Sequence, residues 1–260
     1  MAETAAFIVR DLEFRYPRAT APLFTGLSTQ IDRGSITALM GANGSGKSTF
    51  FKLLSKNLKP RAGSIRLLGR DLADYRQMEL ARTLAVVWQH NTAPYDITVR
   101  NLVAYGRIPH RRAFATENAA DTAAIERALE FCDLADLAEQ RMAELSGGQQ
   151  QRVWIALGLA QESPIMLLDE PTTFLDIAYQ AMILRLVQRL RDELDRTIVL
   201  ILHDVNQAIA VADRIVALEV GGRVTSGTPA ELTDEQFLRR LYGTDLRVLN
   251  DGEHRFIATL

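Results

Sequence analysis

Cysteine and long hydrophobic runs are both scarce in this sequence of 260 residues. Cys132 is the single cysteine, which excludes a disulfide within the chain and favours a reducing compartment. The longest purely apolar runs are short, such as 198–202, whereas a bilayer span needs roughly 18 to 20 apolar residues. The apolar residues 7–9 are also too few for the core of a signal peptide. These absences predict a chain that stays in the cytoplasm and does not span a membrane.

An excess of one sign of charge is missing as well, because 30 basic residues nearly balance 32 acidic ones and leave a net charge of -2. A dedicated nucleic-acid-binding protein is usually more basic, so the sequence disfavours that partner. The remaining composition, 47% hydrophobic and 24% charged, is that of an ordinary globular protein and excludes collagen-like or wholly disordered chains. At roughly 150 residues per domain, the length predicts one large domain or a domain with an inserted subdomain.

Hydrophobic patterning predicts alternating strands and helices. Alternation over 7–16 is typical of an antiparallel strand with one wet face. Short apolar runs predict buried strands, and helical periodicity predicts the helices; the strands are 35–40, 165–169 and 197–202, and the helices 47–57, 179–194 and 229–241. The order strand, helix, strand implies parallel pairing through right-handed crossovers. Two glycines within 219–224 predict a hairpin, and the stretch 95–141, rich in alanine, leucine and charge, predicts a mostly helical insertion.

A glycine-rich loop stands between the first buried strand and the first helix. Its sequence fits G-x-x-x-x-G-K-[ST] and consists of Gly41, Ala42, Asn43, Gly44, Ser45, Gly46, Lys47, Ser48 and Thr49. Glycines let backbone N–H groups curl around phosphate oxygens, and the helix start adds positive potential. Lys47 would reach the terminal phosphates, and the Ser48 hydroxyl would ligate Mg²⁺. The loop therefore predicts a site for a nucleoside triphosphate with Mg²⁺.

The same loop argues against two other nucleotide sites. Its glycines do not have the G-x-G-x-x-G spacing of a dinucleotide-binding fold, so hydride transfer is disfavoured. Lysine occurs only at positions 47, 52, 56 and 59, and none of these lies in an Asn-Lys-x-Asp run of the kind that reads guanine. We therefore expect ATP as the nucleotide.

Two adjacent carboxylates, Asp169 and Glu170, end the apolar strand 165–169. A parallel sheet presents its carboxyl edge to the ligand, so both side chains are expected there. Asp169 would hold Mg²⁺, through water, as in P-loop ATPases. Glu170 would then orient and deprotonate the attacking water.

A second glycine-containing helix start follows the helical insertion. Leu145 is followed by Ser146, Gly147, Gly148 and Gln149 and then by an amphipathic stretch. Ser146 is expected to cap the helix, and the two glycines expose N–H groups at its positive end, which predicts a second phosphate-binding surface. With this LSGGQ motif, the phosphate loop and Asp169-Glu170, nearly the whole chain resembles the ATP-binding cassette (ABC) ATPases.

The resemblance implies a fold and a domain organisation. The expected class is α/β, a P-loop NTPase core with a mainly parallel sheet, an N-terminal antiparallel β region and an inserted helical subdomain. The whole chain, 1–260, would form one ABC ATPase domain, with 1–94 and 163–260 as the RecA-like core and 95–162 as the helical subdomain that carries LSGGQ.

The family pattern also assigns roles to single residues. Tyr16 resembles the aromatic that stacks on adenine, and Gln89 resembles the glutamine that touches Mg²⁺ and the attacking water. His203 resembles the histidine that contacts the γ-phosphate, and Asp176 corresponds to the aspartate that faces the dimer partner. In such dimers the LSGGQ surface of one copy meets the phosphates bound by the other, head to tail. The commoner family motif at this place is SALD, whereas residues 173–176 here read TFLD, so Phe174 departs from the pattern.

Further wording resembles one transporter group. The stretches YGRIPH at 105–110, LDEPTTFLDIAYQ at 168–180, LHDVNQAIAVAD at 202–213 and YGTDLRVL at 242–249 are similar to the ATPases of iron-siderophore, haem and cobalamin importers. The resemblance implies an ATPase at the cytoplasmic face of the membrane that partners a second copy of itself, a polytopic permease and, indirectly, a substrate-binding protein. Ferric siderophore is the first expectation, and haem or cobalamin is the alternative. A soluble ABC ATPase acting on ribosomes or nucleic acid, or a module that only senses ATP, would be a different class.

Overall fold

The computed structural model describes residues 4–111, 116–250, 252 and 255–259. Two compact units divide the described chain, one formed up to Asp74 and from Arg191 onwards, the other by Tyr75–Leu190. The first unit carries the phosphate loop, and the second carries Gln89, Glu170 and the LSGGQ motif. Residues 112–115, inside the predicted helical subdomain, lie outside the described part.

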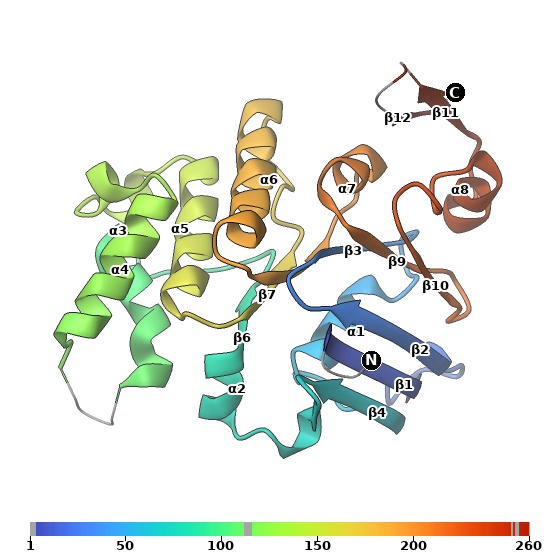
Figure 1. Cartoon of the computed structure of the whole chain (residues 1–260), viewed down its shortest axis with the longest axis horizontal. Helices are drawn as coiled ribbons and strands as arrows, with labels where there is room; N and C mark the ends of the chain where they lie inside the picture. The colour runs from blue at the N-terminus through green and yellow to red at the C-terminus, as the bar shows by residue number, and fades with distance from the viewer. Residues whose placement is uncertain (1–3, 112–115, 251, 253–254, 260) are drawn as a thin grey trace. The chain divides into compact units, whose positions relative to one another are not determined.

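An antiparallel sheet opens the first unit (Figure 1). It contains β1 (Ala5–Phe14), β2 (Phe24–Asp32), β4 (Ala62–Leu67) and β5 (Arg70–Asp71) in the order β2-β1-β4-β5. The alternation read from the sequence holds only in the second half of β1, because the first half, Ala5 to Val9, is almost wholly buried. The predicted antiparallel N-terminal region is confirmed.

Parallel strands form the second sheet region of the first unit. β3 (Ile36–Met40), which is buried throughout, pairs in parallel with both β8 (Thr197–Ile201) and β9 (Arg214–Leu218). β10 (Val224–Gly227) returns antiparallel to β9 through Gly221 and Gly222, whose φ angles are 95° and 84°. The predicted strands and the hairpin are therefore confirmed.

Short helices connect these strands. α1 (Lys47–Leu54) follows β3 and ends before the predicted residue 57, and α7 (Val205–Val211) follows β8. The helix expected from Pro229 begins only at α8 (Glu235–Tyr242), because the Asp234 carboxylate accepts a hydrogen bond from the N–H of Phe237 at 2.9 Å and caps the helix there. The prediction of helix over 229–234 was wrong. A hairpin of β11 (Leu246–Asn250) and β12 (Arg255–Thr259) follows α8.

The second unit combines two parallel strands with helices. β6 (Leu84–Val87) pairs in parallel with β7 (Ile165–Asp169), so both strands end at the same edge. The helices α3 (Val99–Ala104), α4 (Ala119–Phe131) and α5 (Gly147–Ala160) pack on one another, as the green and yellow-green helices of Figure 1 show. α2 (Gln77–Thr83) precedes β6, and α6 (Ile177–Asp192) follows β7. The predicted helical insertion is thus observed as α3 to α5.

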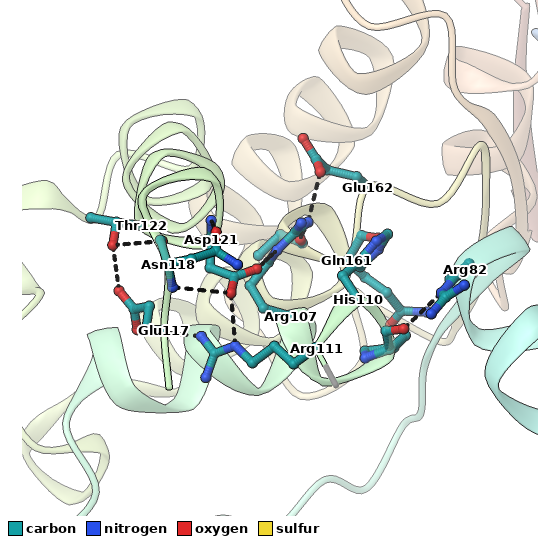
Figure 2. Close-up of polar contacts among 12 residues, drawn as sticks. Arg82, Arg107, His110, Arg111, Glu117, Asn118, Asp121, Thr122, Gln161 and Glu162 are labelled. Carbon is teal, nitrogen blue, oxygen red and sulfur yellow. Dashed lines mark hydrogen bonds and ion pairs between the residues drawn. The ribbon is translucent and has the colours of Figure 1, made fainter. Parts of the chain in front are cut away.

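A buried ion pair fastens these helices together (Figure 2). Arg107, in the 3-10 helix η3 (Tyr105–His110), donates from Nε to Asp121 at 3.0 Å and from Nη1 to the carbonyl of Ala160 at 2.7 Å. Asp121 belongs to the first turn of α4 and also accepts from Arg111 Nε at 3.1 Å. The side chains of Arg107 and Asp121 are 6% and 2% exposed, so their charges are compensated inside the protein rather than by water.

In the described part of the chain, no helix is both long enough and apolar enough to span a membrane.

Candidate functional site

The phosphate loop joins the buried end of β3 to the start of α1. Gly41, Gly44 and Gly46 have φ angles of 145°, 80° and 101°, a region that residues with a Cβ rarely adopt. A Cβ on Gly41 would lie 2.2 Å from the carbonyl oxygen of Leu218, and one on Gly46 would lie 2.7 Å from the Phe24 ring. Packing as well as backbone conformation therefore requires glycine at both ends of the loop.

The first turn of α1 has no side-chain cap among the described residues, because the N-cap position is Gly46 in a left-handed conformation. The opening N–H groups of a helix need partners, and an anion can supply them. Asn43, Gly44 and Ser48 are exposed around this turn. The helix start is therefore suited to phosphate oxygens.

Two buried polar side chains lie beneath the loop. Lys47 is 6% exposed, and its Nζ donates to the carbonyls of Gly41 at 2.7 Å and Ala42 at 3.1 Å. Ser45 is 1% exposed, and its Oγ has no hydrogen-bond partner within the described part of the chain. Because buried hydroxyls are normally hydrogen-bonded, this orphaned atom fits a ligand oxygen.

Tyr16 is brought to the same loop. Its hydroxyl shares a hydrogen bond of 2.9 Å with Oγ1 of Thr49, and its ring meets Phe14 edge-on with centroids 4.9 Å apart. Tyr16 remains 41% exposed. The tyrosine predicted to stack on adenine is therefore tethered to α1 while part of its ring faces solvent.

Glu170 and Gln89 meet in the second unit, beyond the ends of β7 and β6. The Gln89 amide donates to Oε2 of Glu170, and Thr173 Oγ1 donates to the same oxygen at 3.1 Å. Glu170 has a φ angle of 50°, uncommon for a residue with a side chain. The two donors and this backbone turn fix the direction of the carboxylate.

The other strand-end residues lie where the sequence predicted them. Asp169 is the last residue of β7, and His203 lies between β8 and α7. Within the first unit, His203 lines an open cavity of about 540 Å³ together with Gly41, Ala42 and Asn43 of the phosphate loop. This arrangement brings the histidine to the loop, as its proposed contact with a terminal phosphate requires.

The LSGGQ segment forms a capped helix start. Ser146 Oγ accepts from the N–H of Gln149 at 3.3 Å, and Gln149 Oε1 accepts from the N–H of Ser146 at 2.8 Å, which is a capping box. Ser146 and Gly147 are exposed, whereas Gly148 is buried and a Cβ there would lie 2.3 Å from the Tyr179 ring. The predicted cap is confirmed, and Gly148 is required by packing.

Asp176 accepts a single hydrogen bond at the start of the next helix, α6. Its Oδ1 accepts from the N–H of Tyr179 at 2.9 Å at the start of α6. Phe174, two residues earlier, is 87% exposed with a φ angle of 65°. The segment from Phe174 to Asp176 is thus held at the surface.

Sequence reasoning missed three residues that contribute to these surroundings. Thr173 binds Glu170, Tyr179 packs on Gly148, and Tyr242 lines the cavity beside the phosphate loop. Burial raises the pKa of Tyr242 to about 12, although a hydrogen bond from the Gly41 backbone partly offsets that rise. No local pattern marks these residues, because each acts through residues distant in the sequence or in the next turn.

Comparisons with known proteins indicate the family of the chain. The family model described as ABC transporter matches residues 24–173, more than half of the chain. The ferric enterobactin transport ATP-binding protein FepC of Escherichia coli is 41% identical over 225 residues, which cover 86% of this chain and 83% of that protein. The iron(3+)-hydroxamate import ATP-binding protein FhuC of Bacillus subtilis is 40% identical, covering 86% and 84%.

A solved structure supports the same assignment. An ABC transporter described as metal-chelate type, in an inward-facing conformation, matches with a TM-score of 0.84 and 29% identity, covering 97% of this chain and 96% of that one. The phosphate loop, the paired carboxylates and the capped LSGGQ helix occur in a chain whose sequence and fold both match this group. The chain therefore belongs to the ABC transporter family and is an ATP-binding ATPase of that family.

Proposed function

We propose that the chain is the ATP-hydrolysing subunit of a bacterial importer that takes up iron-siderophore complexes through a separate permease. The observation that carries the proposal is similarity across most of the chain to ATP-binding proteins named for ferric enterobactin transport and iron(3+)-hydroxamate import. These two cargoes share a chelated ferric ion but differ in the chemistry of the chelator. We therefore propose the class of cargo and not one siderophore.

ATP is held by the phosphate loop in this proposal. Lys47 and the N–H groups at the start of α1 supply positive charge and donors for the phosphates, and the orphaned Ser45 hydroxyl supplies one more partner. Tyr16 stacks on the adenine. The proposed nucleotide-binding residues of this unit are Tyr16, Gly41, Asn43, Gly44, Ser45, Gly46, Lys47, Ser48 and Thr49.

Mg²⁺ is proposed to accompany ATP, and the available donors suit it, because Mg²⁺ prefers oxygen ligands. The proposed ligands are the Ser48 hydroxyl, the Asp169 carboxylate and the Gln89 amide oxygen. Since Gln89 Nε2 donates to Glu170, its Oε1 is the atom left to face a cation or its water. When bound, the ion supplies charge that offsets the negative charge of the phosphates.

Hydrolysis is assigned to Glu170 as the general base. Gln89 and Thr173 both donate to one of its carboxylate oxygens, which orients the group before it takes a proton from water. Lys47 and His203 are proposed to stabilise charge on the terminal phosphate as it leaves. Most of the catalysis would come from positioning and charge, as is typical of phosphoryl transfer.

A second copy of the chain is proposed to complete each site. The start of α5 and its N-cap, with Ser146, Gly147, Gly148 and Gln149, would contact the ATP bound by the partner copy, and Asp176 would face that copy. Each surface contacts its counterpart reciprocally in a two-fold dimer, so two ATP molecules are enclosed. One chain alone is therefore expected to hydrolyse ATP poorly.

Transport requires that ATP bind the closed pair of chains more tightly than the open pair. We propose that the pair works at the cytoplasmic face of the membrane, on a polytopic permease supplied by a substrate-binding protein. Closure on ATP would move the permease, and hydrolysis would reopen the pair. Nucleic acid has no part in this cycle.

The direct test of the ATPase assignment compares two variants in the permease complex. Glu170→Gln should keep ATP binding, lose turnover by about 100-fold or more, and accumulate a closed dimer, because the base is lost while the phosphate loop is intact. Lys47→Ala should weaken ATP binding and turnover together. Nucleotide binding, phosphate release and dimer mass are measured. Normal turnover by Glu170→Gln would remove Glu170 from its role.

The cargo is tested in the reconstituted complex with its binding protein. A ferric siderophore should raise the ATPase rate several-fold, whereas the iron-free chelator, haem and cobalamin should not. Stimulation by haem or cobalamin instead would move the chain to the alternative cargo, and stimulation by RNA or DNA without the permease would place it in the soluble class.

A further inference from the structure

Gly41, where β3 passes into the phosphate loop, is buried and is held on several sides. Its carbonyl oxygen accepts a hydrogen bond from Lys47 Nζ at 2.7 Å. A Cβ at this position would lie 2.2 Å from the carbonyl oxygen of Leu218 and 2.6 Å from Ser45 Oγ, so the Cα atom is closely packed as well. A hydrogen bond also joins the Gly41 backbone to the side chain of Tyr242, the last residue of α8. Segments from both ends of the sequence therefore meet at one residue of the loop.

The effect on the phenol identifies the donor of this last hydrogen bond. Burial raises the pKa of Tyr242 to about 12, and the bond to Gly41 acts against that rise. A donor to the phenol oxygen favours the ionised form and lowers the pKa, whereas an acceptor from the hydroxyl favours the neutral form and raises it. The Gly41 N–H is therefore the donor, and the oxygen of the neutral Tyr242 is the acceptor. Because Gly41 is buried, water would not readily replace this partner if the hydroxyl were removed.

Other contacts of α8 set the position of Tyr242. Gly243 follows it in a left-handed conformation, with a φ angle of 69°, and the N–H of Gly243 donates to the carbonyl of Arg239 at 2.8 Å. This turn ends the helix directly after the tyrosine. Arg240 Nε lies 3.3 Å from Oε2 of Glu219, the buried residue that follows the end of β9. The helix is thus tied to the strand whose last carbonyl packs against the entry of the phosphate loop.

The terminal hairpin supports α8 and the neighbouring α7. The N–H of Val248, in β11, donates to Oε1 of Glu235 on α8 at 3.1 Å. Asn206, on α7, donates from Nδ2 to the carbonyl of Ile257 in β12 at 3.0 Å and accepts from the N–H of Ile257 at 2.7 Å. These elements form a fixed support beside the cavity that Tyr242 and the phosphate loop line together.

We propose that Tyr242 is a positioning residue for ATP binding, whose hydroxyl holds the N–H side of Gly41 while Lys47 serves the phosphates. The inference rests on the proposed role of the phosphate loop as the ATP site. In the structure, Lys47 donates to the carbonyls of Gly41 and Ala42, and a lysine has only three N–H donors. A lysine that reaches phosphate oxygens has fewer donors left for these carbonyls. The bond from the Gly41 N–H to the tyrosine does not compete with phosphate, so it holds the loop in both cases.

A support of this kind affects ATP binding more than the chemical step. A loop that is ordered beforehand binds its ligand more tightly, because less conformational freedom is lost on binding. Bound phosphates then hold the loop themselves, and the rate of hydrolysis depends on Glu170 and His203 as proposed above. Loss of the Tyr242 hydroxyl should therefore raise the KM for ATP and leave kcat nearly unchanged.

Tyr242→Phe tests this pattern in the complex with the permease, because the variant keeps the ring and removes only the hydroxyl. The KM for ATP should rise about 10-fold, as expected for one lost hydrogen bond, with kcat within two-fold of the parent. Arg239→Ala is the matched control on α8. Its ion pair with Asp245 leaves both side chains more than half exposed, so both kinetic constants should stay within two-fold of the parent.

Hydrogen exchange distinguishes positioning of the loop from general loosening of the fold. In the full chain carrying isotope-labelled glycine, the Gly41 amide should exchange about 10-fold faster in Tyr242→Phe than in the parent, because its acceptor is gone. The amide of Gly106, in the second unit, should exchange at the parent rate. Equal acceleration at both glycines, or an unchanged Gly41 amide, would overturn the proposal.

Lys47→Ala separates failure of this inference from failure of the proposed ATP site. If Lys47→Ala weakens ATP binding and Tyr242→Phe does not, the tyrosine does not position the loop and the proposed function stands. If Lys47→Ala binds ATP as the parent does, the phosphate loop is not the ATP site and both proposals fail. A lower kcat with an unchanged KM in Tyr242→Phe would also overturn the inference, since it would place the hydroxyl in the chemical step.

Discussion

The two helix starts assigned to ATP are built in opposite ways. The N-cap of α1 is Gly46, a left-handed residue, and no side chain in the described chain caps its first turn. The N-cap of α5 is Ser146, which forms a capping box with Gln149. The first helix start thus depends on an external partner for its N–H groups, whereas the second satisfies part of its own.

This difference assigns the two surfaces an order of action. Under the proposed function, the uncapped start of α1, with Lys47 beneath it, would hold ATP within a single chain. The capped start of α5 offers fewer N–H groups and no lysine, so we expect it to bind phosphate weakly alone. It would contribute only after another copy presents a nucleotide already held, and the proposed pairing of two chains would then depend on ATP.

Gly46→Ala is expected to have the largest effect on this comparison. The new Cβ would lie 2.7 Å from the buried Phe24 ring, and the alanine backbone would have to keep a φ angle of 101°. Strain and overpacking together should lower the free energy of unfolding by about 3 kcal/mol and abolish ATP binding. Gly44→Ala is the matched control, because nothing lies within 4 Å of its Cβ, and it should cost only about 1 kcal/mol. Equal costs in urea unfolding would contradict the packing argument.

A third helix start, that of α4, extends the comparison, because its capping box pairs the N-cap Asn118 with Asp121, a charged and buried residue of the first turn. Burial alone would raise the pKa of Asp121, but hydrogen bonds from Arg107 and the Asn118 N–H, with the charges of Arg111 and Arg107, lower it overall. The folded pKa then lies below the unfolded one. The stability that Asp121 contributes is therefore fully present above about pH 4, and it is lost as the pH falls through the pKa of Asp121 in the folded protein.

Asp121→Asn should accordingly lower stability at neutral pH by about 2 kcal/mol, since it weakens a buried charged hydrogen bond. In this variant the free energy of unfolding should also fall less steeply between pH 7 and pH 3. Urea unfolding from pH 7 down to pH 3 measures both effects. Glu126→Gln is a control on the same helix, because its ion pair with Arg100 leaves the Glu126 side chain 50% exposed. An unchanged fall between pH 7 and pH 3 in Asp121→Asn would show that other carboxylates set the profile.

Ser146→Ala is expected to have the smallest effect on stability, about 1 kcal/mol, from loss of the α5 cap. Ser146→Gly should cost only a few tenths of that. Both variants should bind ATP normally as single chains, because α1 is untouched, and both should lose turnover as pairs. Calorimetry measures ATP binding by the single chains, and phosphate release measures turnover by the pairs. Weakened ATP binding by the isolated variant chain would contradict the assignment of single-chain ATP binding to the start of α1 alone.

Local patterns predicted the parts of the site that depend on neighbours in the sequence. The glycine spacing indicated the phosphate loop, and Ser146 with Gln149 indicated the cap, because both need only a few adjacent residues. The contact between Gln89 and Glu170 joins residues 81 apart, so no periodicity could reveal it. The late start of α8 at Glu235 shows the same limit, since Asp234 could have been read as one more helical residue.

The Asn206 side chain binds Ile257 through two hydrogen bonds to its main chain, one to the carbonyl and one from the N–H. Almost any side chain could replace that isoleucine without loosening the terminal strand, but proline could not, since it lacks the N–H that the amide oxygen holds. β12 can therefore change in sequence at this position while its backbone stays attached to α7, in the unit that carries the phosphate loop.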